Sequence, residues 1–298
     1  MAKVGFIKRY LYIVDRLQSV PSDFQELHKY VMTRLGNDDI DTTFEFSTRT
    51  FDRDKKDIFD LFGILIQYNR KEKVYYIDDE IEDTSVSRML EAFSIHQVLK
   101  EGNKISPSIY LENRKSTGTH LINGILYAIQ NHLQVSFTHT KFWDVETTQR
   151  VVKPIAIKES QHRWYLIAQD NKDGSVKNFG FDRISDLRIS DTKFKPIIYN
   201  IEKTYQHAFG VETYAPVQKV VLEFSWQQGN YIKSFPLHKS QKVILDNEKK
   251  LIVELLIHPT NDFIMELMRF GAEVKVIEPE VLRNTIKDRV TNMIKLYK

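Results

Sequence analysis

Cationic and hydrogen-bonding side chains recur in the central part of the sequence. The members of this set are His139, Lys141, Arg150, Arg163, Tyr165 and Arg183. A guanidinium group can hold a phosphate or carboxylate through two parallel hydrogen bonds, and a tyrosine hydroxyl supplies a further donor. An aromatic ring beside such groups can also stack on a nucleobase. These residue types favour a site for an anion, such as a nucleotide or a short single-stranded nucleic acid.

Five strand-like runs must position these side chains. The runs are 135–142, 151–158, 163–168, 177–181 and 187–194. Short strands separated by polar turns favour a small closed or nearly closed sheet. Alternation along the third run places Trp164 and Leu166 on one face, and Arg163 and Tyr165 on the other. We interpret Trp164 and Leu166 as core residues and expect the opposite face to be available to a ligand.

Arg183 follows the end of the fourth run, where its guanidinium can reach an anion. The alternative is an ion pair with Asp182 or Asp186, which would occupy the same group. If the strand continues that far, alternation turns Asp182 away, so that Arg183 and Tyr165 converge on one mouth of the sheet. The role of His139 stays open, because a histidine there can be a donor in the pocket or an ordinary strand residue.

The first eighty residues contain three helical patterns of apolar residues, followed by a predicted hairpin. The helical patterns span 7–17, 24–35 and 48–62. The third pattern follows Ser47, a favoured helix cap, and stops at Gly63, a residue favoured where helices end. Residues 64–77 predict two strands joined by a basic turn. Three helices followed by a hairpin is the element order of a winged helix-turn-helix.

The third helical pattern carries a basic stripe opposite its apolar face. The candidate contacts to DNA on this helix and on the hairpin turn are Thr48, Arg49, Arg53, Lys56, Arg70, Lys71 and Lys73. In the functional interpretation the helix enters the major groove and the turn touches phosphates. The alternative is a solvated charged face, because the same helix also carries Asp52, Asp54, Asp57 and Asp60. Residues 1–80 hold 13 basic and 15 acidic side chains, so binding must depend on their local arrangement.

Two further parts complete the chain. Residues 84–100 and 121–132 predict helices that bridge the N-terminal and central parts. The C-terminal part predicts a small α+β module with strands at 219–224, 251–257 and 274–277 and helices at 261–270 and from 279. His238 and Ser240 could suggest hydrolase chemistry, but no acid that would orient the histidine is in the pattern. We therefore do not expect catalysis there.

Several of these segments resemble the WYL domain of bacterial ligand-responsive transcription regulators, a domain named after the tripeptide that stands here at 164–166. The other segments that carry the resemblance are 135–139, 150–154 and 181–184. Residues 236–241 and 270–274 resemble the WCX extension that follows WYL domains. Residues 47–54 resemble the start of the recognition helix in the same regulators.

The resemblance implies an α+β multidomain protein with four parts in chain order. These are a winged helix-turn-helix DNA-binding domain at 1–80, a helical bridge at 81–133, an Sm-like β-barrel sensor at 134–198 and a WCX domain at 214–298. It also implies a cytoplasmic homodimer that binds a double-stranded DNA operator, with an inverted repeat expected. Its effector would be an anionic nucleotide or single-stranded nucleic acid. The bridging helices would mediate dimer contacts or transmit motion, or they would be packing spacers.

Composition excludes several other classes. The absence of cysteine excludes disulfides and thiolate metal sites, and a formal charge of +3 is too small to indicate a nucleic-acid partner by itself. No apolar run is long enough to span a membrane. No phosphate-binding glycine loop, dinucleotide fingerprint or His-Glu metal helix occurs, so we expect no cofactor, no metal and no enzyme activity. The alternatives left open are an RNA-binding or accessory subunit that modulates a nucleic-acid enzyme and, less favoured, an enzyme acting on nucleotides.

Overall fold

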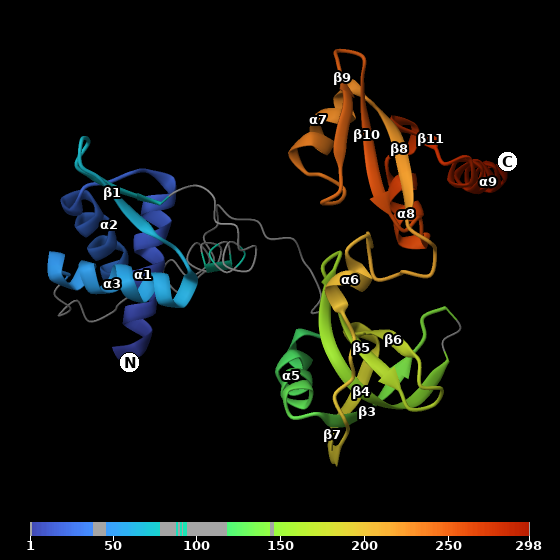
Figure 1. Cartoon of the computed structure of the whole chain (residues 1–298), viewed down its shortest axis with the longest axis horizontal. Helices are drawn as coiled ribbons and strands as arrows, with labels where there is room; N and C mark the ends of the chain where they lie inside the picture. The colour runs from blue at the N-terminus through green and yellow to red at the C-terminus, as the bar shows by residue number, and fades with distance from the viewer. Residues whose placement is uncertain are drawn as a thin grey trace. The chain divides into compact units, whose positions relative to one another are not determined.

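The computed structural model describes residues 2–37, 46–77, 88, 90, 92–93, 118–143 and 146–297. The chain divides into two compact units, Met1–Asn113 and Arg114–Lys298, and each is described by itself (Figure 1). Most of the helix predicted at 84–100 lies outside the described residues. Of its apolar side chains, Leu90 is buried and the ring of Phe93 lies 5.6 Å from that of Tyr12.

The first unit contains the three predicted helices and the predicted hairpin. They are α1 Ala2–Ser19, α2 Phe24–Asn37, α3 Thr48–Phe62, β1 Ile66–Asn69 and β2 Val74–Ile77. Ser47 caps α3 by accepting the N–H of Thr50 at 3.2 Å. Gly63 ends α3 in the left-handed region at φ 67°, where a residue without a side chain has no steric penalty. The predicted cap and the predicted end are therefore both confirmed.

A buried ion pair joins α1 to α3 in the core of this unit. The Nε and Nη2 atoms of Arg9 donate to the two carboxylate oxygens of Asp54, over 2.6 and 2.8 Å. Both side chains are almost completely excluded from solvent. Asp54 does not offset the basic stripe of α3 as its place on this helix predicts, because it faces the core and is neutralised by Arg9, 45 positions away.

The first sheet of the second unit has five antiparallel strands. They are β3 Leu133–Thr140, β4 Thr147–Ser160, β5 Arg163–Asp170, β6 Val176–Gly180 and β7 Ile184–Lys193. All five predicted strands are confirmed, with shifted ends. The sheet order is β6-β5-β4-β3-β7, and α5 Ile122–Gln130 packs on it. The described pairings leave β6 and β7 as edges, so the sheet does not close into the barrel that we expected.

The core of this sheet explains where the turn after β6 is placed. Leu166, Phe179 and Phe181 are buried with apolar residues of α5. A Cβ atom on Gly118, which has φ +83°, would lie 2.7 Å from the Cβ of Phe181. The absence of that atom lets the start of the domain pack against the turn that carries Arg183. Trp164 is only partly buried, so it contributes less to the core than its alternation with Leu166 predicted.

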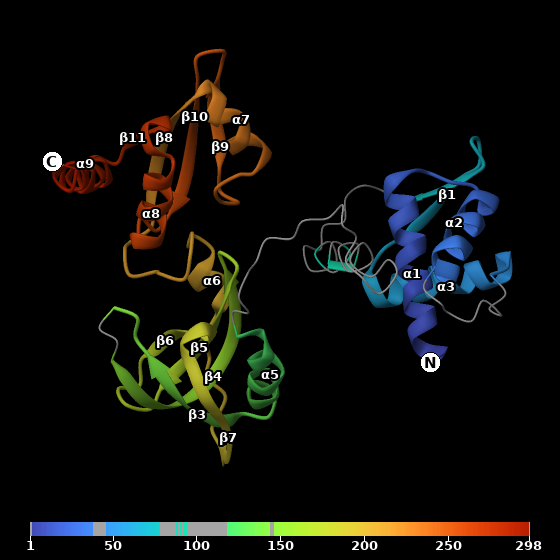
Figure 2. The same ribbon diagram turned by 180° about the vertical axis from the view of Figure 1, so that it is seen from behind.

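The C-terminal module is a four-stranded sheet covered by helices (Figure 2). Its elements are β8 Gln218–Ser225, α7 Trp226–Ser234, β9 Lys242–Asp246, β10 Lys250–Ile257, α8 Asn261–Arg269, β11 Val274–Glu278 and α9 Glu280–Lys295. The strand order is β11-β8-β10-β9, and the short helix α6 Ile201–Tyr205 precedes the module. The predicted strands and helices are confirmed, whereas α7 and β9 were missed. No described helix is long and apolar enough to cross a membrane.

His238 and Ser240 lie in a turn and not on a strand. The Ser240 hydroxyl donates to the backbone oxygen of Leu256 and accepts its N–H, both at 3.0 Å. His238 Nδ1 lies 2.8 Å from the same hydroxyl. The Ser240 hydroxyl therefore pairs with both backbone groups of Leu256 on β10, which is a structural role.

We predict that Asp54→Ala strongly destabilises the first unit, because it leaves the Arg9 guanidinium buried without a partner. The expected loss of unfolding free energy is about 3–5 kcal/mol. Asp52→Ala is the matched control on the same helix, since Asp52 forms an exposed pair with Lys55 at 2.9 Å, and its expected loss is below about 1 kcal/mol. Hydrogen exchange of the amides of α1 and α3 measures both. Equal effects of the two substitutions would contradict the structural role of the Arg9–Asp54 pair.

Candidate anion-binding and nucleic-acid interfaces

The strand register brings most of the predicted ligand-binding residues to one end of the five-stranded sheet. His139 on β3 lies opposite Thr148 on β4 and opposite Ile184, the residue that follows Arg183. Arg150 is two positions from Thr148 on β4, so it shares a face with His139. Tyr165 on β5 lies opposite Gly180 at the end of β6. Residues far apart in sequence therefore meet around the turn that follows β6.

His139 forms the buried centre of this group. Its side chain is 8% exposed, and its ring meets that of Phe179 edge-on at 5.3 Å. Its Nε2 atom is buried and has no hydrogen-bond partner among the described residues. Burial and the neighbouring positive charges lower the pKa of His139 to about 4. In order of decreasing effect, these charges are Arg183, Arg150 and Lys141. The imidazole is therefore neutral near pH 7 and lies among three cations.

The guanidinium of Arg183 occupies space that Gly180 leaves free. A Cβ atom on Gly180 would lie 2.8 Å from both Nε and Nη2 of Arg183. The guanidinium carbon also lies 5.9 Å from the centre of the Phe142 ring. Its Nε is buried without a hydrogen-bond partner in the described part of the chain, and it lies 3.8 Å from the nearest oxygen of Asp182. The predicted alternative, an ion pair with Asp182, is present only as this long contact.

The other cations of the group already have carboxylate partners. Arg163 Nη1 donates to Asp182 at 2.5 Å, Arg150 Nη1 to the buried Asp170 at 3.0 Å, and Lys141 Nζ to Glu146 at 2.6 Å. The expectation that alternation turns Asp182 away is wrong, because β6 ends at Gly180 and residues 181–183 form a turn. The capacity to bind an anion therefore lies chiefly at Arg183 and His139.

The electrostatic surroundings of Tyr165 include both this group and the C-terminal module. Burial raises the pKa of Tyr165, and the positive charge of Arg183 offsets part of that rise. Asp262 in the first turn of α8 also acts on it electrostatically, and the same carboxylate accepts the N–H of Val211 at 2.9 Å. Sequence reasoning missed Gly180, Phe142 and Asp262. Only Gly180 carried a signal, because a glycine directly before the Phe-Asp-Arg segment can mark a close approach.

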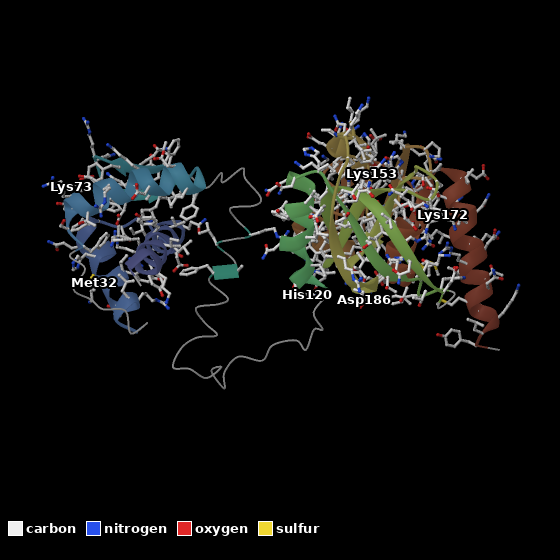
Figure 3. All side chains as sticks on the ribbon, turned by 90° about the horizontal axis from the view of Figure 1, so that it is seen from below. Met32, Lys73, His120, Lys153, Lys172 and Asp186 are labelled. Atoms are coloured by element: carbon white, nitrogen blue, oxygen red, sulfur yellow. The ribbon has the colours of Figure 1, made fainter. Side chains whose placement is uncertain are left out.

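The candidate DNA-binding side chains of the first unit are all exposed. Among the described residues, none of the six basic side chains of this set forms an ion pair, and Lys73 lies in the hairpin turn (Figure 3). The aspartates of α3 are less available. Asp54 is buried, Asp57 accepts the hydroxyl of Tyr10 at 2.6 Å, and Asp52 is paired with Lys55. Asp60 stays exposed beside Lys56, where both line a shallow groove with Phe59 and Leu65.

Among the described residues, no cluster of three histidine, aspartate or glutamate side chains could hold a metal ion.

Comparisons with known proteins identify two domain families. The WYL domain model matches residues 120–189, and the WCX domain model matches residues 216–294. The first range includes α5, which lies within the segment 81–133 that was predicted to form the bridge. No curated protein matches the chain.

The solved structures that are similar to the chain include the following two. One is proteasome accessory factor B/C (PafBC) of Arthrobacter aurescens, which is 16% identical in sequence and has a TM-score of 0.35. The match covers 95% of this chain and 46% of that protein's chain. The chain therefore spans about half the length of that relative. The other is described as a CRISPR Cas-related protein, with 10% identity and a TM-score of 0.41, covering 98% of this chain and 84% of that one. Likeness at these values says nothing about activity.

We predict that Gly180→Ala displaces the Arg183 guanidinium without unfolding the sheet. Gly180 has ordinary φ and ψ angles of −65° and 132°, so alanine fits the backbone, and the ends of the Arg183 and Asp182 side chains, which lie 2.7–2.8 Å from the added Cβ, must move instead. Loss of a charge-assisted hydrogen bond should weaken pyrophosphate binding about tenfold or more. Calorimetric titration measures the affinity. Gly124→Ala on α5, where a Cβ meets only ordinary contacts, is the control, and an unchanged affinity in Gly180→Ala would contradict the assignment.

We predict that His139 titrates near pH 4 in the free protein and at a higher pH when pyrophosphate is bound. A bound anion offsets the positive charges that lower the pKa of His139. Because this pKa is depressed in the fold, the unfolded chain takes up the proton first, and stability falls by about 3 kcal/mol between pH 6.5 and 4. NMR titration of the His139 imidazole in the presence and absence of pyrophosphate follows the proton. A pKa of His139 that pyrophosphate leaves unchanged would place the anion elsewhere.

Proposed function

The chain belongs to the proteins that carry a WYL domain followed by a WCX domain, and from this premise we propose that it is a ligand-responsive transcription regulator. Its first unit would bind duplex DNA, and its WYL domain would sense an anionic nucleotide or single-stranded nucleic acid. It would act by binding and not by catalysis, in the cytoplasm, where its DNA is.

The proposal that the first unit binds DNA rests chiefly on the exposed basic face of α3. Arg49 and Arg53 lie one turn apart on that face and are free of ion pairs within the described residues. Arginine can pair with the edge of guanine through two hydrogen bonds, which makes it the commonest side chain for reading a base. Withdrawal of Asp54 into the core by Arg9 removes one charge that would repel phosphate. The order of helices and hairpin supports a winged helix-turn-helix for this unit.

The unpartnered nitrogen atoms of His139 and Arg183 support the sensing part. A buried donor or acceptor without a partner costs about 1–3 kcal/mol. A ligand that supplies partners would remove this cost in addition to forming its own contacts. The guanidinium of Arg183, whose Nε lies 3.8 Å from the nearest Asp182 oxygen, favours a negatively charged ligand.

A homodimer completes the proposal. One recognition helix contacts only a few base pairs of DNA. Regulators of this architecture gain specificity when two DNA-binding domains are related by a two-fold axis. The selected DNA should then be an inverted repeat.

Selection of bound fragments from random duplex DNA tests the proposal, because it reports binding, sequence and symmetry together. Arg49→Ala and Arg53→Ala should each weaken binding of the selected duplex by about 1–3 kcal/mol, because each removes contacts to base edges. Lys71→Ala should weaken binding of all duplexes alike and reduce its salt dependence, because it removes a phosphate contact. Fluorescence anisotropy at several salt concentrations measures these affinities.

Arg183→Ala is the matched control from the second unit. It should leave the affinity of the ligand-free protein for the duplex unchanged, while it abolishes the response of that affinity to an added oligonucleotide. Wild-type affinity in both α3 variants would show that α3 has been misassigned as the reading helix. A full response to the effector in Arg183→Ala would rule out the sensor site.

A further inference from the structure

The turn between β3 and β4 presents two large aromatic side chains to solvent. Phe142 is 60% exposed and Trp143 is 97% exposed. Single exposed apolar residues are common on protein surfaces. This pair differs because it borders the cationic group: it follows Lys141 directly, and the guanidinium of Arg183 lies over the Phe142 ring at 5.9 Å. Aromatic surface and cation are therefore adjacent at the same end of the sheet.

Because most cations of the site are already paired, an aromatic surface would add affinity that charge alone does not provide. Arg163, Arg150 and Lys141 each have a carboxylate partner within 3.0 Å. The excess positive charge is therefore small, and attraction to phosphate alone provides limited affinity. Stacking of a base on an aromatic side chain contributes about 1–3 kcal/mol per base and does not depend on charge. A ligand that carries both a phosphate and a flat ring uses both features of the surface.

We propose that Phe142 and Trp143 form a stacking surface that selects phosphates bearing a nucleobase over simple anions. The phosphate would meet Arg183 and His139 while a base, in single-stranded nucleic acid or a free nucleotide, stacks on the Trp143 indole. This assignment rests on the proposed sensing function and adds to it the residues that distinguish a nucleic-acid ligand from other anions.

The test compares two hexamers with the same number of phosphates. One is hexathymidylate, and the other is an abasic strand that carries no bases. The wild type should bind hexathymidylate about tenfold more tightly than the abasic strand, which corresponds to one well-stacked base. Trp143→Ala should lose most of that preference, whereas Trp143→Phe should retain most of it. Because Trp143 is almost fully exposed, neither substitution should change thermal stability.

Arg183→Ala should weaken binding of both hexamers by the same factor, because it removes the phosphate contact and leaves the aromatic surface in place. Thymidine monophosphate, used as a competitor, distinguishes a free nucleotide from a strand as the source of the base. If the wild type shows no base preference, or if Trp143→Ala retains it, the stacking surface is refuted while the sensor site stands. If Arg183→Ala binds both hexamers like the wild type, or if the wild type binds neither, the sensing function fails and the stacking surface fails with it.

Discussion

The candidate sensor site depends on how one guanidinium is held next to a buried imidazole. Arg183 lies over Gly180 because that position has no side chain. Burial and the neighbouring positive charges lower the pKa of His139, so its imidazole is neutral near pH 7. Both groups keep a buried nitrogen without a partner in the described structure. Leaving a buried nitrogen without a partner costs free energy, which an anion that supplied partners to both groups would recover.

Carboxylates limit how strongly this site can attract an anion by charge alone. The buried Asp170 holds Arg150 and also accepts Lys177 at 2.8 Å. Asp182 forms an ion pair with Arg163. Breaking a buried pair is expensive because it leaves a charge without a partner, so Arg150 is tied to the sheet. Discrimination among ligands must therefore come from the geometry around Arg183 and from groups outside the ion pairs.

Local patterns in the sequence predicted the elements well, but not the pairings between them. Alternation and helical spacing located the five strands of the central sheet and the three helices of the first unit. β9 was missed because all of its residues are exposed, so no alternation marks it, and α7 was missed because Gly229 interrupts its pattern. The Arg9–Asp54 pair spans 45 positions, and the contact of Asp182 with Arg163 requires a turn where a continued strand was assumed. Neither follows from periodicity.

The candidate sensor site is also connected to the C-terminal module through β6. The Asn178 side chain accepts the hydroxyl of Tyr205 at 2.7 Å and donates to the backbone oxygen of Val211 at 2.6 Å. The N–H of Val211 is held in turn by Asp262 at the start of α8. A displacement at Gly180, two positions from Asn178, therefore has a path of direct contacts to the WCX domain. Contacts alone do not transmit a signal, because a ligand shifts an equilibrium only when it binds two arrangements with different affinity. A second arrangement in which the unpartnered nitrogens of His139 and Arg183 gained partners within the protein would bind the anion less well, and the two arrangements would then differ in affinity as such a shift requires.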